Sequence, residues 1–250
     1  MFSVKSGKPI AAIRGGTRGD GVLGVTENGD VEALGRDIEL RKGRFEPILE
    51  LEGRCIDYTA GPSGAGKSTY VGGLIKRHRK LHPDARVIVY SRGKIDEDPA
   101  FKEIEGGVEQ AELGAHLVEA PLDITGLEKG TILVFDDVGT ILDDKVKEAV
   151  HKIIMDCAEV GRKQGIYLIV TSHLVNPNDR KFGRVMLNEM QFLTLFPGGG
   201  NAHSVRYVLR QYLGLDSKQI QRILDSKSRW VRIHVHSPRW VLEETAAYII

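Results

Sequence analysis

The sequence predicts an α/β protein in which a mostly parallel β-sheet is flanked by helices. A glycine-rich loop at residues 61–69 stands between a strand-like segment, Cys55 to Ala60, and a segment whose apolar residues have helical spacing. Further along, the short apolar runs ARVIVY, TILVF and IYLIV each predict a buried strand, and helical patterns alternate with them. These two observations carry the fold class.

The glycine-rich loop reads GPSGAGKST and fits the pattern G-x-x-x-x-G-K-[ST] of a phosphate-binding loop, or P-loop. Small residues let the backbone wrap around a triphosphate, and a helix that starts at Gly66 adds its positive dipole end. A chance glycine-rich turn is the alternative, but the strand–loop–helix context argues against it. The buried strand contains one polar residue, Asp57, which such strands usually lack. The predicted nucleotide-binding residues are Gly61, Pro62, Ser63, Gly64, Ala65, Gly66, Lys67, Ser68 and Thr69.

Within this loop we expect Lys67 to reach the β- and γ-phosphates and the Ser68 hydroxyl to bind Mg²⁺. Residues 131–135 then form a buried strand that delivers Asp136 and Asp137, which is the Walker B pattern. We predict that Asp136 holds Mg²⁺ through water and that Asp137 polarises the attacking water.

The strand after the acid pair supplies a further candidate. Asp143 and Asp144 are expected to cap a long helix that runs to Val160. The strand that follows, residues 166–170, ends in Thr171, Ser172 and His173, where many ATPases keep a sensor of the γ-phosphate. This order is typical of P-loop ATPases that insert an additional strand between the P-loop strand and the Walker B strand.

Composition limits the remaining possibilities. The chain is 41% hydrophobic and 28% charged, as is ordinary for a globular protein, and its formal net charge is only +1. Any nucleic-acid surface must therefore be a local patch. Cys55 and Cys157 lack metal-ligand spacing and are expected to be buried free thiols in a reducing compartment. We expect neither a signal peptide nor a transmembrane segment.

We predict a β-rich region over residues 1–50 and a P-loop ATPase domain over 51–250, with a helical and β elaboration from about residue 201. In the first region, Asn28-Gly29 predicts a hairpin between residues 21–27 and 30–34. Residues 91–130 read as a loop-rich insertion with one short helix. The elaboration predicts helices at 203–213 and 217–225 and strands near 230–235 and 240–242.

Together these motifs resemble the FtsK–HerA group of DNA-pumping ATPases. Within it, the likeness is to the genome-packaging ATPase of poxviruses, other large cytoplasmic DNA viruses and virophages. The matching pieces are GPSGAGKST at 61–69, ILVFDD at 132–137, GRKQGIYLIVTSH at 161–173 and FLTLFP at 192–197. The resemblance implies a hexameric or pentameric ring in which Arg162 is an arginine finger for the neighbouring subunit. It also implies that His173 replaces the glutamine often found as the sensor.

The resulting hypothesis is a motor that hydrolyses ATP with Mg²⁺ and packages double-stranded DNA into a preformed capsid. Capsid or membrane-vertex proteins are implied partners, and the expected location is the host cytoplasm at viral assembly sites, or the virion. Arg180, Lys181 and Arg184 are the candidate DNA contacts. Two alternatives stay open: a nucleoside or nucleotide kinase, with residues 180–184 as its lid, and a nucleotide switch that does not hydrolyse.

Overall fold

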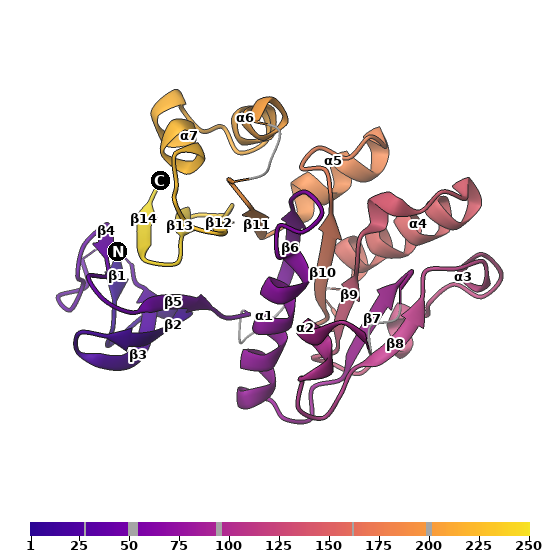
Figure 1. Ribbon diagram of the computed structural model, residues 1–250, viewed down its shortest axis with the longest axis horizontal. Helices are drawn as coiled ribbons and strands as arrows, with labels where there is room; N and C mark the ends of the chain where they lie inside the picture. Colours follow the sequence, from indigo (N-terminus) through magenta and orange to yellow (C-terminus); the bar gives the residue numbers. More distant parts are fainter. Residues whose placement is uncertain (28, 50–54, 94–96, 162, 199–201) are drawn as a thin grey trace.

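A computed structural model describes residues 1–250 apart from 28, 50–54, 94–96, 162 and 199–201. Helices cover a large central sheet, and a smaller antiparallel sheet built from the N-terminal residues lies beside it (Figure 1). The fold class expected from the sequence is therefore confirmed.

The central sheet has the strand order β4-β14-β13-β12-β11-β6-β10-β9-β7-β8, and its strands run parallel from β11 to β8. Strand β10 pairs with β6 on one side and with β9 on the other. It therefore separates the strand before the P-loop from the strand before the acid pair, which is the additional strand that we predicted. The parallel strands are β6 (Cys55–Ala60), β7 (Val87–Ser91), β8 (Glu109–Glu112), β9 (Ile132–Phe135), β10 (Tyr167–Ser172) and β11 (Phe192–Leu195).

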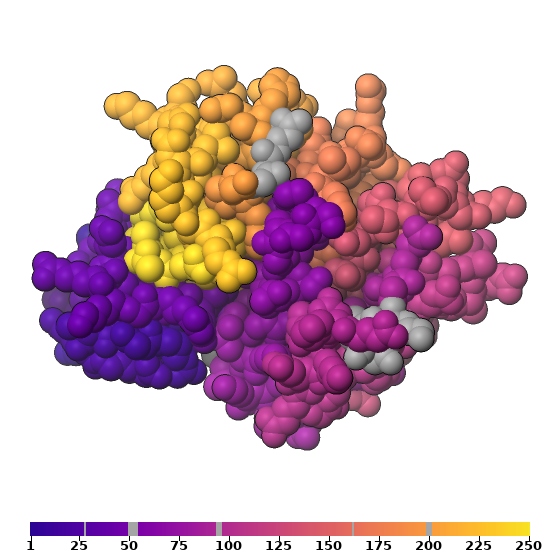
Figure 2. Space-filling model, viewed as in Figure 1, coloured from indigo at the N-terminus to yellow at the C-terminus, as the bar shows by residue number. Residues whose placement is uncertain are grey.

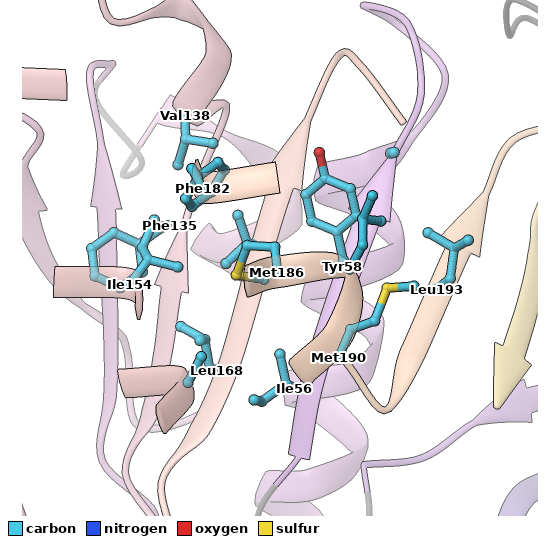
Figure 3. Packing of buried hydrophobic residues seen from close by; sticks show 14 of the residues in the cluster. Ile56, Tyr58, Phe135, Val138, Ile154, Leu168, Phe182, Met186, Met190 and Leu193 are labelled. Atoms are coloured by element: carbon cyan, nitrogen blue, oxygen red, sulfur yellow. The ribbon is translucent and has the colours of Figure 1, made fainter. Parts of the chain in front are cut away.

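Two layers of helices bury the two faces of the parallel strands. Helix α1 (Lys67–Leu81) packs on one face through residues such as Val71 and Leu74. Helices α4 (Asp144–Val160) and α5 (Arg180–Glu189) cover the opposite face, where Ile154, Phe182 and Met186 meet Ile56, Tyr58 and Leu168 (Figure 3). Alternate residues of each strand thus enter different cores, as the two-residue repeat of a strand requires.

Local sequence signals set the ends of these helices. The Asp143 carboxylate accepts hydrogen bonds from the N–H groups of Lys145 and Val146, at 2.9 and 3.0 Å, so it caps α4 as predicted.

The two cysteines are buried. Cys157 on α4 is 2% exposed, and Cys55 at the start of β6 is fully buried. Both are free thiols in apolar surroundings, as expected, and burial raises the pKa of each to about 12.

The C-terminal segment extends the parallel sheet with antiparallel strands. Strand β12 pairs with β11, and β13, β14 and β4 follow outward. The smaller sheet has the order β1-β3-β2-β5. The remaining elements are β1 (Phe2–Ser3), β2 (Lys8–Gly16), β3 (Gly19–Val25), β4 (Asp37–Glu39), β5 (Arg44–Pro47), α2 (Pro99–Lys102), α3 (His116–Glu119), α6 (Ala202–Gln211), α7 (Ser217–Leu224), β12 (Val231–His234), β13 (Trp240–Leu242) and β14 (Ala246–Ile249). The division near residue 50 stays a prediction, and its boundary falls on residues outside the described part.

The predicted strand at residues 30–34 is wrong. Strand β3 lies between β1 and β2, so both of its edges are already paired and neither can accept the predicted partner. Residues 30–34 form turns instead, in which the Asp30 carboxylate accepts hydrogen bonds from the Glu32 N–H (2.7 Å) and the Ser6 hydroxyl (2.8 Å). Asn28 itself lies outside the described residues.

The segment from Ser91 to Gly130 also differs from expectation. It contains two short helices, α2 and α3, and the strand β8 at the edge of the central sheet. Strand β8 reads EQAE and is largely exposed, so it lacks the apolar run by which buried strands are found. Strand β14 was likewise missed near the C-terminal end of the chain.

The unexpected Asp57 has a specific partner. Its carboxylate lies 3.1 Å from the guanidinium of Arg232 on β12, and both side chains are fully buried. The hydroxyls of Thr59 and Thr194 donate to the same carboxylate, at 3.0 and 3.1 Å. Burial raises the pKa of Asp57, and the Arg232 charge opposes that rise. A buried acid on the P-loop strand is therefore matched by a cation from the C-terminal strands.

Candidate active site

The P-loop joins β6 to α1 with the geometry of an anion site. Gly64 and Gly66 have φ angles of 75° and 99°, which favour glycine. Gly66 is the N-cap of α1, where no side chain caps the helix and no acidic residue stands in the first turn. The N–H groups of the first turn are therefore available to a ligand, and the helix dipole favours an anion. The loop is also tied to β10, because the Gly61 N–H donates to the Ser172 carbonyl (3.0 Å).

Lys67 lies in the middle of this site and is only 6% exposed. Its Nζ donates hydrogen bonds to the carbonyl oxygens of Gly61 (3.1 Å) and Pro62 (3.4 Å). The same Nζ lies 3.2 Å from Oδ1 of Asp137 and forms an ion pair with it. The lysine is thus held over the loop by its own backbone and by the second residue of the acid pair.

Thr171 on β10 positions both residues of the acid pair. Its hydroxyl donates to Oδ1 of Asp136 (2.7 Å) and accepts from the Asp137 N–H (2.8 Å). Neighbouring parallel strands end at the same edge of the sheet, which brings the end of β10 to the acids that follow β9. We named Thr171 only as part of a polar strand end, and its spacing along the chain carries no sign of this contact. Its role follows from the pairing of β10 with β9.

The two acids occupy different environments. Asp136 is partly buried, and this desolvation raises its pKa, while the Thr171 hydrogen bond opposes the rise and the nearby Asp137 charge adds to it. Asp137 has a φ of 50°, a left-handed conformation that is uncommon for a residue other than glycine. This conformation turns the chain directly after the strand into the short 3₁₀ turn at Val138–Thr140.

His173 and Lys67 contact different oxygens of the Asp137 carboxylate. The Nε2 of His173 is 3.1 Å from Oδ2 of Asp137, whereas Lys67 contacts Oδ1. Within the described residues, Asp137 Oδ1 and His173 Nε2 are buried atoms without a hydrogen-bond partner. Both atoms nevertheless lie within 3.2 Å of a polar atom, Asp137 Oδ1 of Lys67 Nζ and His173 Nε2 of Asp137 Oδ2, so Asp137 links the lysine to the histidine.

The residues present fit a magnesium ion bound together with a nucleotide. No group of three or more His, Cys, Asp or Glu side chains that could hold a metal occurs among the described residues. Mg²⁺ in phosphoryl-transfer sites needs no such cage, because phosphate oxygens and water supply most of its ligands. Ser68 and Asp136 offer one hydroxyl and one carboxylate oxygen donor, and a cation would offset the cost of burying the Asp136 charge.

The basic residues predicted to contact DNA lie outside this cluster. Arg162 falls outside the described residues. Arg180, Lys181 and Arg184 are exposed on the first turns of α5, which packs inward through Phe182. None of the helices in the described part of the chain combines the length and hydropathy that crossing a bilayer requires.

Comparisons with known proteins agree with this architecture. No model of a protein family matches the chain. The chain is 36% identical over 250 residues to the uncharacterized protein V3 of Sputnik virophage, and the match covers 97% of this chain and 96% of V3. That identity and coverage are high enough to establish homology.

Solved structures match at the level of the fold. The genome packaging NTPase B204 from Sulfolobus turreted icosahedral virus 2, in complex with sulfate, has a TM-score of 0.51 at 13% identity and covers 78% of this chain and 96% of its own. B204 has also been solved in complex with ATP-γ-S. VirB4 of Thermoanaerobacter pseudethanolicus has a TM-score of 0.52 at 11% identity and covers 99% of this chain and 97% of its own. Identities this low show a shared fold alone.

Proposed function

The chain belongs to the family of Sputnik virophage protein V3, and from this premise we propose that it is an ATP-hydrolysing motor that packages double-stranded DNA. One observation carries the proposal. Lys67 of the P-loop, the Asp136–Asp137 pair and the end of β10 are joined by direct contacts at one edge of a sheet that contains the additional strand. The likeness of this fold to the packaging NTPase B204 supports the same function.

In the proposed reaction, the N–H groups of the P-loop and Lys67 hold the phosphates, and Ser68 and Asp136 would hold Mg²⁺. The metal would neutralise charge on the phosphates. Asp137 orients the attacking water. His173, whose Nε2 lies 3.1 Å from Oδ2 of Asp137, is proposed as the sensor of the γ-phosphate. The assay that tests this function measures phosphate release with and without double-stranded DNA, and DNA should stimulate it. A thermal shift with nucleosides and no response to DNA would instead favour a kinase.

The two acids should fail in different ways when each is changed to asparagine. We expect Asp136→Asn to weaken Mg²⁺-dependent nucleotide binding, because a metal ligand loses its charge. Asp137→Asn should leave binding nearly intact and abolish turnover, because only the orientation of water is lost. Titrations with an ATP analogue, with and without Mg²⁺, and steady-state turnover separate the two effects. Equal behaviour of the two variants would contradict the assignment of separate roles.

We propose that the active form is a ring of six or five copies, in which Arg162 of one subunit acts on the nucleotide of the next. The expected partners are double-stranded DNA and proteins of the capsid or of a membrane vertex. The expected location is the viral assembly site in the host cytoplasm, or the virion. Native mass measurement with an ATP analogue and DNA would give the number of subunits.

DNA should bind through local basic positions, because the net charge of the chain is only +1. Arg180, Lys181 and Arg184 are exposed on α5 and are the proposed contacts. We expect affinity to fall as salt rises, with a log–log slope of about −0.9 for each phosphate contacted. Replacing all three residues with alanine should make this slope shallower and lower DNA-stimulated turnover, with little dependence on DNA sequence.

The matched control removes three exposed charges elsewhere. Lys80, Lys102 and Lys152 are exposed on α1, α2 and α4, and their triple alanine variant should keep the original salt slope. Fluorescence anisotropy with two duplexes of unrelated sequence measures both variants. An unchanged slope in the α5 variant would exclude α5 as the DNA contact.

A further inference from the structure

A groove of about 470 Å³ opens directly beside the P-loop, on the side of α1 that faces the C-terminal strands. The P-loop contributes Ala65, Gly66 and Thr69 to its wall, and residues 44–47 and Arg229 to Trp230 close it from the other two sides. Figure 2 shows purple atoms of the segment around the P-loop beside the yellow atoms of the C-terminal strands on one face of the molecule. The volume of the groove is within the range of small-molecule binding sites.

Aromatic side chains from α1 and from the residues next to β11 and β12 line the groove. Tyr70 on α1 lies with its ring centroid 5.5 Å from that of Trp230 and 6.2 Å from that of Phe196. Phe196 also approaches the first glycine of the loop so closely that a Cβ at Gly61 would lie 2.8 Å from its ring. Tyr70 and Phe196 are buried, at 6% and 5% exposure, and they support the half-buried ring of Trp230 at the groove wall.

A cation stands at the point where the groove meets the loop. The Arg229 guanidinium lies 3.9 Å from the position that a Cβ at Gly66 would occupy. Its backbone is held in place, because the Arg229 N–H donates to the Glu244 carboxylate (2.9 Å) and the Glu244 N–H donates to the Ser228 hydroxyl (2.9 Å). Arg229 is exposed, so its side chain can turn toward a ligand in the groove.

We propose that this groove binds the purine base and ribose of the nucleotide whose phosphates the P-loop holds. The inference rests on the proposed function, because it requires a nucleotide at the P-loop. Phosphates held by the first turn of α1 leave the nucleoside to continue along the surface next to Gly66 and Thr69, where the groove begins. The half-buried ring of Trp230 offers a stacking or edge contact to a flat base, and the exposed Arg229 offers a hydrogen-bond donor and a cation to its π-face or to the ribose hydroxyls.

Tryptophan fluorescence tests this placement without relying on activity. The chain contains two tryptophans, Trp230 in the groove and Trp240 in the core, so the variant Trp240→Phe leaves Trp230 as the only reporter. The ligands are Mg²⁺-ATP and inorganic tripolyphosphate with Mg²⁺, which carries the phosphates without a base. ATP should change the emission of Trp230, and tripolyphosphate should leave it nearly unchanged.

Affinities of variants provide the second measurement. Trp230→Ala should weaken ATP binding by about tenfold, as loss of base–aromatic stacking does, while tripolyphosphate binding stays the same. Arg229→Ala should weaken ATP binding in the same selective way. Because Arg229 is exposed, this variant should keep its fold and can replace Trp230→Ala if that variant unfolds. The neighbouring exposed Lys227→Ala is the control and should bind both ligands normally.

The possible outcomes separate the two proposals. If ATP binds in a manner that depends on Lys67 but neither the Trp230 emission nor the Arg229 variant responds, the groove proposal is overturned and the proposed function stands. If ATP does not bind at all, both are overturned. A selective loss of ATP affinity relative to tripolyphosphate supports the groove.

Discussion

The variant Lys67→Ala is expected to bind ATP poorly and to hydrolyse it slower by a factor of about 10² or more. The Nζ of Lys67 is buried at the centre of the loop and is held 3.2 Å from Asp137. In the proposed reaction this charge stabilises the β- and γ-phosphates, both in the bound state and as charge develops during transfer. Its loss therefore affects binding and turnover together. A fluorescent ATP analogue and steady-state phosphate release measure the two quantities.

Two controls make this result interpretable. Lys80→Ala removes an exposed lysine at the other end of the same helix and should leave both quantities unchanged. Thermal unfolding of Lys67→Ala shows whether the fold survives, since Asp137 loses its ion-pair partner. Turnover close to that of the unchanged protein would refute the P-loop assignment.

The variant Arg162→Ala is expected to bind ATP almost normally and to lose between about 10³ and 10⁵ in turnover. An arginine finger stabilises charge that develops only in the transition state, so its removal spares the ground state. The expectation comes from the motif at residues 161–173, because Arg162 lies outside the described residues. Lys163→Ala, the exposed neighbour in sequence, is the matched control and should keep full turnover. Loss of a helix-terminal charge alone would cost at most ~1 kcal/mol of stability and little activity.

Mixing experiments decide whether Arg162 acts on a neighbouring subunit. Subunits carrying Lys67→Ala still have the finger, and subunits carrying Arg162→Ala still have the P-loop. A mixed ring contains interfaces that pair an intact P-loop with an intact finger, so mixing the two inactive proteins should restore part of the turnover. Mixed rings that form without regaining activity would exclude the role in trans.

Local patterns were sufficient wherever one segment carries the whole signal. The P-loop between β6 and α1, the Asp143 cap of α4 and the buried strand before Asp136 all follow from spacing within a few residues. The order of motifs along the chain also indicated the additional strand, which β10 forms between β6 and β9. Helix caps, helical periodicity and buried apolar runs depend on neighbours in the chain, so the sequence alone carries them.

Local patterns failed where a residue's meaning depends on a distant partner. Asp57 is an isolated polar residue in its strand, and its buried charge is paired only because β12 brings Arg232 to 3.1 Å. The predicted hairpin between residues 21–27 and 30–34 is absent because β1 and β2 pair with both edges of β3. The turn residues alone do not indicate which strands pair with those edges.

In the candidate active site, too, some features follow from local sequence patterns and others from contacts between distant residues. From the sequence we predict which residues bind phosphate and metal, because the P-loop and the acid pair are contiguous motifs. The contacts of Thr171 with both acids, and the position of Arg229 and Trp230 in the same groove wall as Gly66, depend instead on the tertiary fold. Those contacts arise from strand order and from packing of the C-terminal segment against α1, which set distances between residues that no spacing along the chain records.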